Sequence, residues 1–186
     1  MTSFDNALKA YNGNASFVAF DLETTGLDPV NDQIVEIGAI KFDRRGPIAR
    51  FSVLVNPGIP MPAEAVKVNN ITDEMLAGKD GIEKVLPDFL QFIDGSTVIA
   101  HNAPFDCGFI NEKLKIIRAP YPSLPNPVID TLAFSREKFP ALKSHSLQNL
   151  AAALNISARD AHRAEDDARL CMELFKYCLN CDDKAA

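Results

Sequence analysis

The 186-residue sequence contains no tryptophan, only four cysteines and no long apolar run. Its first sixteen residues, MTSFDNALKAYNGNAS, lack the uninterrupted apolar stretch of a signal peptide. No later run approaches the roughly 18 apolar residues that a membrane-spanning helix needs. We therefore expect a cytoplasmic protein without membrane association.

The cysteines are few, and three of the four fall in one C-terminal segment, which fits that compartment. Cys178 and Cys181 form a CxxC pair. A structural zinc site needs about four ligands, usually with a second such pair, and a redox CxxC normally opens a helix after a strand. We interpret this pair as packing at the end of a helix.

Positive charge is scarce, because 19 Lys and Arg residues face 25 Asp and Glu residues, for a formal net charge of −6. Charge alone therefore argues against a general nucleic-acid binder. This argument from net charge is weaker if acidic residues bind divalent cations, since a site that holds such cations attracts phosphate. Three basic groups are interpreted as solvated surface and give only weak support for a polyanion path: Arg44/Arg45/Arg50, Lys113/Lys115/Arg118 and Arg136/Lys138/Lys143.

Length and composition, with 47% hydrophobic and 24% charged residues, fit one globular α/β domain over residues 1–186, with its core at about 17–178. Three closely spaced strands at about 17–20, 33–42 and 48–55 predict an antiparallel meander. Later short strands alternate with helices, which predicts parallel additions to the sheet, covered by helices. Pro87 lies inside a helical pattern, so that helix either begins there or kinks.

Two carboxylates, Asp21 and Glu23, stand in the stretch FDLETTGL, where the first strand ends. Residues i and i+2 of a strand point to the same face. Two like charges are therefore expected on one face at the end of a buried strand.

A third carboxylate, Asp106, falls in the first turn of a helix expected from Pro104 to about Ile117. It precedes Phe109 and Ile110 by three and four residues, so it shares their buried stripe. Taken alone, Asp106 is better explained as a residue that stabilises the helix dipole.

The last helix carries a fourth carboxylate. Asp167 lies within its apolar stripe, which consists of Ala164, Ala168, Cys171, Leu174, Phe175 and Cys178. The neighbouring Asp166 falls on a polar flank, and we predict it to be solvated. A carboxylate on the core face needs a basic residue, hydrogen-bond donors or a metal as its partner.

Four acidic residues at the ends of core-facing elements suit a pair of hard cations. Carboxylate oxygens bind Mg²⁺ or Mn²⁺, and shared carboxylates hold two such ions in enzymes that cleave phosphodiesters. Two Mg²⁺ or Mn²⁺ ions are therefore the expected cofactors.

Three segments, FVAFDLETTGL, VIAHNAPFDCGFI and AHRAEDDARL, resemble the motifs of the DEDDh family of 3′-to-5′ exonucleases, typified by the proofreading epsilon subunit of bacterial DNA polymerase III. The ordered set is specific, although each motif alone is modest evidence. The resemblance implies the ribonuclease H-like fold, a five-stranded mixed sheet with three antiparallel and two parallel strands flanked by helices. It also implies that the metal-site acids are Asp21, Glu23, Asp106 and Asp167, with His162 as general base.

The resemblance further implies substrate contacts at Thr24, Thr25, Gly26 and Leu27, the last as a wedge against the terminal base. A plain turn after the strand explains the same letters without a ligand. Asn102 either orients the scissile end or serves its turn. We expect Asp130 to be a helix N-cap. The family pattern HGIT reads NNIT at residues 69–72, which puts any substrate contact there in doubt.

Three functions remain open. The favoured one is hydrolysis at single-stranded or frayed DNA 3′ ends, releasing nucleoside 5′-monophosphates in proofreading or repair, with a DNA polymerase as a candidate partner. An exoribonuclease that trims RNA ends is the alternative within enzymes, because the motifs do not report on the 2′-hydroxyl. A non-catalytic cation-binding or nucleic-acid-docking module is disfavoured, because docking does not require His162.

Overall fold

The structure is a computed structural model, which describes residues 2–13, 15–157 and 163–180. Its five-stranded sheet has the order β3-β2-β1-β4-β5. The strands are β1 (Phe17–Thr24), β2 (Ile34–Asp43), β3 (Gly46–Leu54), β4 (Thr97–Ala100) and β5 (Val128–Asp130). The first three pair antiparallel, and β4 and β5 add in parallel to β1, so the predicted meander with two parallel additions is confirmed.

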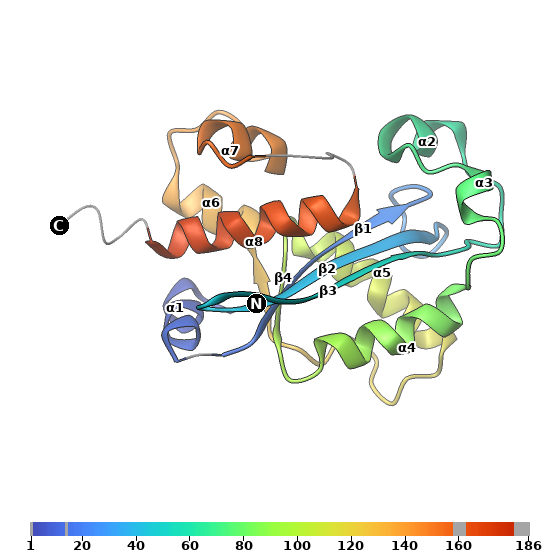
Figure 1. Cartoon of the computed structure of the whole chain (residues 1–186), viewed down its shortest axis with the longest axis horizontal. Coiled ribbons are helices and arrows are strands. Elements are labelled where there is room, and N and C mark those ends of the chain that lie inside the picture. Colours follow the sequence, from blue (N-terminus) through green and yellow to red (C-terminus); the bar gives the residue numbers. More distant parts are fainter. Residues whose placement is uncertain (1, 14, 158–162, 181–186) are drawn as a thin grey trace.

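The described helices cover both faces of this sheet (Figure 1). They are α1 (Phe4–Asn12), α2 (Ala63–Asn69), α3 (Asp73–Leu76), α4 (Ile82–Ile93), α5 (Ala103–Ile116), α6 (Thr131–Lys138), α7 (Leu147–Ala153) and α8 (Ala164–Asn180). One core cluster joins the sheet to α4 and α5, and a second joins it to α1, α6, α7 and α8.

Strand β1 contributes to both clusters because its side chains alternate between the two faces. Val18, Phe20 and Leu22 pack with α4 and α5. Phe17 and Ala19 pack on the α8 side. The strand continues in extended form to Thr24, four residues beyond the predicted end. The residues that follow Ala19 at intervals of two therefore also face α8.

Two of the described helices, α1 and α2, were not predicted from the sequence. Helix α1 precedes the predicted core, yet its Tyr11 ring lies 5.9 Å from the ring of Phe17 and 6.0 Å from that of Phe175. Helix α2 follows the proline-rich loop directly and belongs to a small third cluster with Val35 and Leu76. The hydrophobic core therefore reaches further toward the N-terminus than predicted.

One alternative for the helix at Pro87 is wrong. Helix α4 begins at Ile82 and runs through Pro87, so it does not start at the proline.

The predicted packing role of the C-terminal cysteines holds for Cys171 and Cys178, which are buried, whereas Cys181 lies outside the described residues. No helix in the described part of the chain is long and apolar enough to cross a membrane.

Candidate active site

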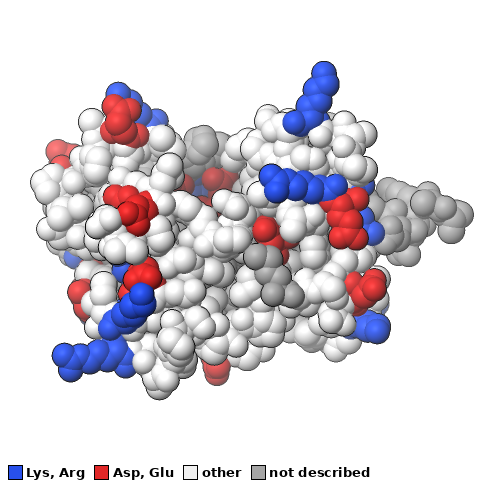
Figure 2. Space-filling view, turned by 180° about the vertical axis from the view of Figure 1, so that it is seen from behind, with Lys and Arg blue, Asp and Glu red and all other residues white. Residues whose placement is uncertain are grey.

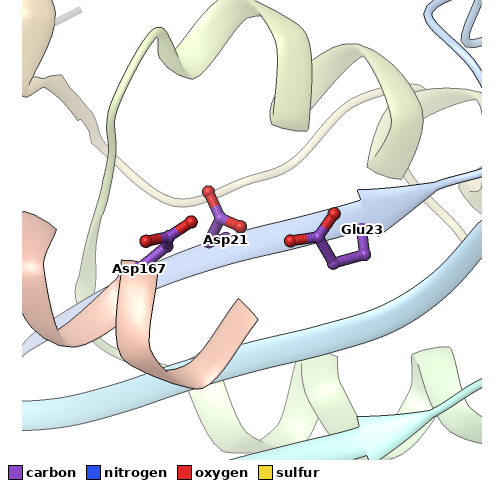
Figure 3. A group of neighbouring side chains, drawn as sticks. All are labelled: Asp21, Glu23 and Asp167. Atoms are coloured by element: carbon purple, nitrogen blue, oxygen red, sulfur yellow. The ribbon is translucent and has the colours of Figure 1, made fainter. Parts of the chain in front are cut away.

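Three carboxylates meet where β1 passes under the first turn of α8. Asp21 and Glu23 point from β1 toward Asp167 of α8 (Figure 3). Each of the three offers a carboxylate oxygen, and these oxygens all lie within 4.8 Å of one another. The period-two prediction for Asp21 and Glu23 is thus confirmed.

The apolar stripe of α8 sets the direction of Asp167. All six stripe residues are buried, and Asp167 is only 8% exposed. Its Oδ1 accepts a hydrogen bond of 2.7 Å from Nε2 of Gln148 on α7. The helix is therefore rotated as predicted, with Asp167 toward the sheet.

The neighbouring Asp166 is not the solvated residue that we predicted. Its side chain is 10% exposed, and its Oδ1 lies 2.7 Å from Nε of Arg169. Because Arg169 follows three residues later, its side chain folds back along the helix and covers the carboxylate.

The fourth acid, Asp106, reaches β1 from the first turn of α5. It is 2% exposed, and its Oδ1 accepts a 3.2 Å hydrogen bond from the backbone N–H of Leu22. Strand β4 ends at Ala100 and does not reach the last residues of β1. The start of α5 lies beside those residues instead. Asp106 therefore contacts the backbone between Asp21 and Glu23.

Burial and mutual repulsion disfavour the charged forms of these acids. Burial, and then the charges of Asp106 and Asp167, raises the pKa of Asp21 well above its usual range. Burial, followed by Asp167, raises the pKa of Glu23 to about 8. Burial also raises the pKa of Asp106 to about 8. Such concentrated negative potential is what a bound cation relieves.

The donor set fits hard divalent cations. Within the described ranges, no ion pair joins a lysine or arginine to Asp21, Glu23 or Asp106. The converging donors are all oxygens, which Mg²⁺ and Mn²⁺ prefer. The basic side chains on the face seen in Figure 2 are scattered among acidic ones and form no continuous patch.

A largely apolar cavity of about 380 Å³ adjoins Glu23. Its lining brings together four predicted substrate residues with α2 and Phe105: Thr24, Thr25, Gly26 and Leu27. Leu27 is 83% exposed. The structure thus brings these four of the five predicted substrate residues into one cavity beside Glu23.

Hydrogen bonds fix the loop that carries Leu27. Oγ1 of Thr25 donates to Oδ1 of Asp32 at 3.1 Å. A Cβ atom at Gly26 would overlap the Asp32 carboxylate, so a larger residue there would displace that side chain. Nζ of Lys113, only 2% exposed, donates to the Asp32 carbonyl at 2.7 Å, so its interpretation as a solvated cation is wrong.

Asn102 does not line this cavity. It has a left-handed φ of 66° at the N-cap of α5, and its backbone N–H donates to Oδ1 of Asp130 at 3.0 Å. The same oxygen accepts from the N–H of Leu132, which confirms Asp130 as an N-cap. This backbone contact supports the turn role of Asn102, and the substrate role of its side chain stays a prediction.

Two polar residues beside the carboxylates were not predicted. Asn69, at the departure from the family pattern, is 1% exposed, and its Nδ2 donates to the Thr24 carbonyl at 3.3 Å. Its side-chain amide also favours the charged form of Glu23 and thereby opposes the rise in the pKa of that acid. Gln148 is the other, and no sequence pattern singles it out. His162 lies outside the described residues.

The sequence matches the family described as "RNase_T: Exonuclease" over residues 18–175. A relative from Treponema pallidum, named DNA polymerase III subunit epsilon, is 46% identical over 168 residues, covering 89% of this chain and 77% of that protein. A PolC-type DNA polymerase III from Clostridium perfringens is 40% identical over 161 residues, but the match covers 87% of this chain and only 11% of the polymerase.

Two solved structures share the fold. Exonuclease X in complex with 5′ overhanging duplex DNA matches with a TM-score of 0.70 and 24% identity, covering 91% of this chain and 93% of that one. The zinc-bound form of the E. coli exonuclease I–ssDNA complex matches with a TM-score of 0.76 and 18% identity, covering 92% and 41%. The sheet order together with these neighbours identifies the ribonuclease H-like fold.

The raised pKa values predict that metal binding releases protons. At pH 7 a carboxyl with a pKa of about 8 is mostly protonated, so a cation must displace its proton. Calorimetric titration of Mn²⁺ in two buffers of different ionisation enthalpy should show proton release at pH 7 that declines above about pH 8. Proton-free binding at pH 7 would show that Glu23 and Asp106 are already ionised.

The rotation of α8 predicts opposite outcomes for its two adjacent aspartates. Asp167→Asn should eliminate nuclease activity and weaken Mn²⁺ binding, because it removes a converging oxygen ligand. Asp166→Asn should preserve most of both, because Asp166 pairs with Arg169 instead. Calorimetry and oligonucleotide cleavage on the two purified variants decide between them, and the reverse pattern would contradict this assignment.

Proposed function

The chain belongs to the exonuclease family that residues 18–175 match, and from this premise we propose that it is a 3′-to-5′ exodeoxyribonuclease releasing nucleoside 5′-monophosphates. The observation that carries the proposal is the convergence of carboxylates from β1 and α8 within 4.8 Å, with Asp106 against the same strand. A structural or docking domain gains nothing from carboxylates that repel one another, whereas cation-assisted phosphodiester cleavage needs such carboxylates to hold the cations.

We assign the cation site to Asp21, Glu23, Asp106 and Asp167. Two Mg²⁺ or Mn²⁺ ions, when bound there, supply Lewis acidity that activates a water and neutralises charge on the phosphate and the leaving oxygen. His162 is assigned as the general base that takes the proton of the attacking water. That role rests on its place in the third sequence motif.

The cavity beside Glu23 supports binding of a terminal nucleotide. Its lining is largely apolar, which suits the face of a base, and it opens next to the carboxylates. Leu27 exposes its side chain on a loop held by hydrogen bonds, which supports packing of this side chain against the base of the last nucleotide. Thr24 and Gly26 border the same space. This arrangement supports attack at a chain end.

The relatives favour DNA as the substrate. The T. pallidum relative is named as a subunit of DNA polymerase III and the C. perfringens relative as a PolC-type DNA polymerase III, and the exonuclease X and exonuclease I structures contain DNA. We therefore propose single-stranded or frayed DNA 3′ ends as substrate, a DNA polymerase as partner and the cytoplasm as the place of action. An RNA 3′ end uses the same phosphodiester chemistry and is the alternative outcome of the test.

Cleavage of matched DNA and RNA oligonucleotides tests this function. With Mg²⁺ or Mn²⁺, a 5′-labelled DNA strand should shorten stepwise while a 3′-labelled strand releases labelled mononucleotide at once. EDTA should abolish both reactions, and added Mn²⁺ should restore them. Preference for RNA would select the exoribonuclease, and activity that persists in EDTA would contradict the metal site.

His162→Ala should lower the cleavage rate by about 10²–10⁴-fold, the range expected for loss of a general base. Mn²⁺ affinity and thermal stability should change little, because the four assigned ligands remain. Rates measured from pH 5 to 9 provide the check. A variant with a normal rate and an unchanged pH profile would remove His162 from the mechanism.

A further inference from the structure

A fifth carboxylate at this site, Glu36, is buried. It belongs to β2, is 1% exposed, and pairs directly with Glu23 in the antiparallel register. Its charge contributes to the raised pKa of both Asp21 and Glu23. A buried charge so close to other acids is costly unless it has a definite partner.

Both oxygens of Glu36 are already used. Oε1 accepts from Nη2 of Arg163 at 2.7 Å, and Oε2 accepts from Nε of the same arginine at 3.1 Å. Oε2 also accepts from the backbone N–H of Ala164 at 3.2 Å. Ala164 is the first residue of α8, whose first-turn N–H groups have no partner within the helix. Glu36 therefore binds the start of α8 from the neighbouring strand.

Gly38, the next residue on the same face of β2, also contacts α8. A Cβ atom at Gly38 would overlap the main chain of Ala164 and Glu165, so the helix rests directly on the strand there. Gly38 pairs with Asp21, just as Glu36 pairs with Glu23. The two positions that hold α8 thus stand beside the two acids of β1.

A short chain of hydrogen bonds leads from Glu36 to Asp167. Glu36 holds the side chain of Arg163, and the carbonyl of Arg163 accepts from the backbone N–H of Asp167 at 3.0 Å. Any shift of the first helical turn away from Glu36 therefore moves Asp167 relative to β1.

From these contacts we propose that Glu36 is a positioning residue, which through Arg163 and Ala164 sets the placement of Asp167 against Asp21 and Glu23. It is not itself a cation ligand, because its oxygens are committed to α8. This inference rests on the proposed cation site. Supporting residues of this kind change metal affinity or activity by about 10–100-fold when they are lost.

Calorimetric Mn²⁺ titration of the full-length protein tests the role independently of catalysis. Glu36→Gln and the charge-conserving Arg163→Lys, which cannot make the bidentate pair, should each weaken Mn²⁺ binding by about 10-fold or more. Arg45→Lys is the matched control, because Nε and Nη2 of Arg45 both donate to Oδ2 of Asp43 on the same strand, and the Arg45 side chain is 83% exposed. It should leave Mn²⁺ affinity unchanged.

The double variant and the kinetics separate the competing roles. If Glu36 acts through Arg163, combining both changes should weaken Mn²⁺ binding little more than Glu36→Gln alone. The kcat for oligonucleotide cleavage should fall by about 10-fold or more, with KM changed less than about 3-fold. Losses that multiply in the double variant would overturn the proposed link.

Two further outcomes also contradict the proposal. Tighter Mn²⁺ binding by Arg163→Lys would identify Glu36 as a ligand that the arginine restrains. Normal Mn²⁺ affinity in both variants, with only a lower Tm, would leave Glu36 a stabilising role alone. Absence of Mn²⁺ binding by the unsubstituted protein would instead refute the cation site on which the inference rests.

Discussion

Repulsion between carboxylates at the end of β1 is the constraint on which the rest of the structure depends. Strand β1 brings two acids to one place and α5 and α8 bring one each, and the surrounding protein withdraws these acids from water. Burial raises the pKa of Glu23 and Asp106 to about 8, whereas both carboxyls ionise near pH 4 in the unfolded chain. Below about pH 4 these acids are neutral in both states and do not lower the stability of the metal-free fold. As the pH rises from about 4 toward 8, the metal-free fold loses stability, because only the unfolded chain ionises them readily. A divalent cation bound at the proposed site would offset this cost and would couple folding to cation binding.

Rigid supports hold the acids together against this repulsion. The β1–β2 register aligns Asp21 and Glu23 with Gly38 and Glu36, which receive α8. The N–H of Leu22 fixes the acid of α5. The cavity that we propose for a terminal nucleotide lies at the end of the same strand, beside a loop held by hydrogen bonds. One strand therefore positions both the proposed cation site and the proposed substrate cavity.

Sequence patterns predicted the sheet and the acids because both depend on local periodicity. The period-two and helical patterns were sufficient to orient Asp21 and Asp167. They could not find Gln148 or the pair of Glu36 and Arg163, since such contacts join residues 19 and 127 positions apart. The sequence does mark Glu36 as an acid within the apolar run QIVEIGAIKF. Its partner Arg163 could be identified only from the folded structure. The role of His162 stays a prediction from its motif.

Anomalous diffraction from crystals grown with Mn²⁺ tests the central claim most directly. The account predicts two manganese peaks about 3.5–4 Å apart, enclosed by Asp21, Glu23, Asp106 and Asp167. It also predicts that Glu36 keeps its bonds to Arg163 and Ala164 when the ions are bound. Manganese elsewhere on the protein, with these four carboxylates left without a cation, would contradict it.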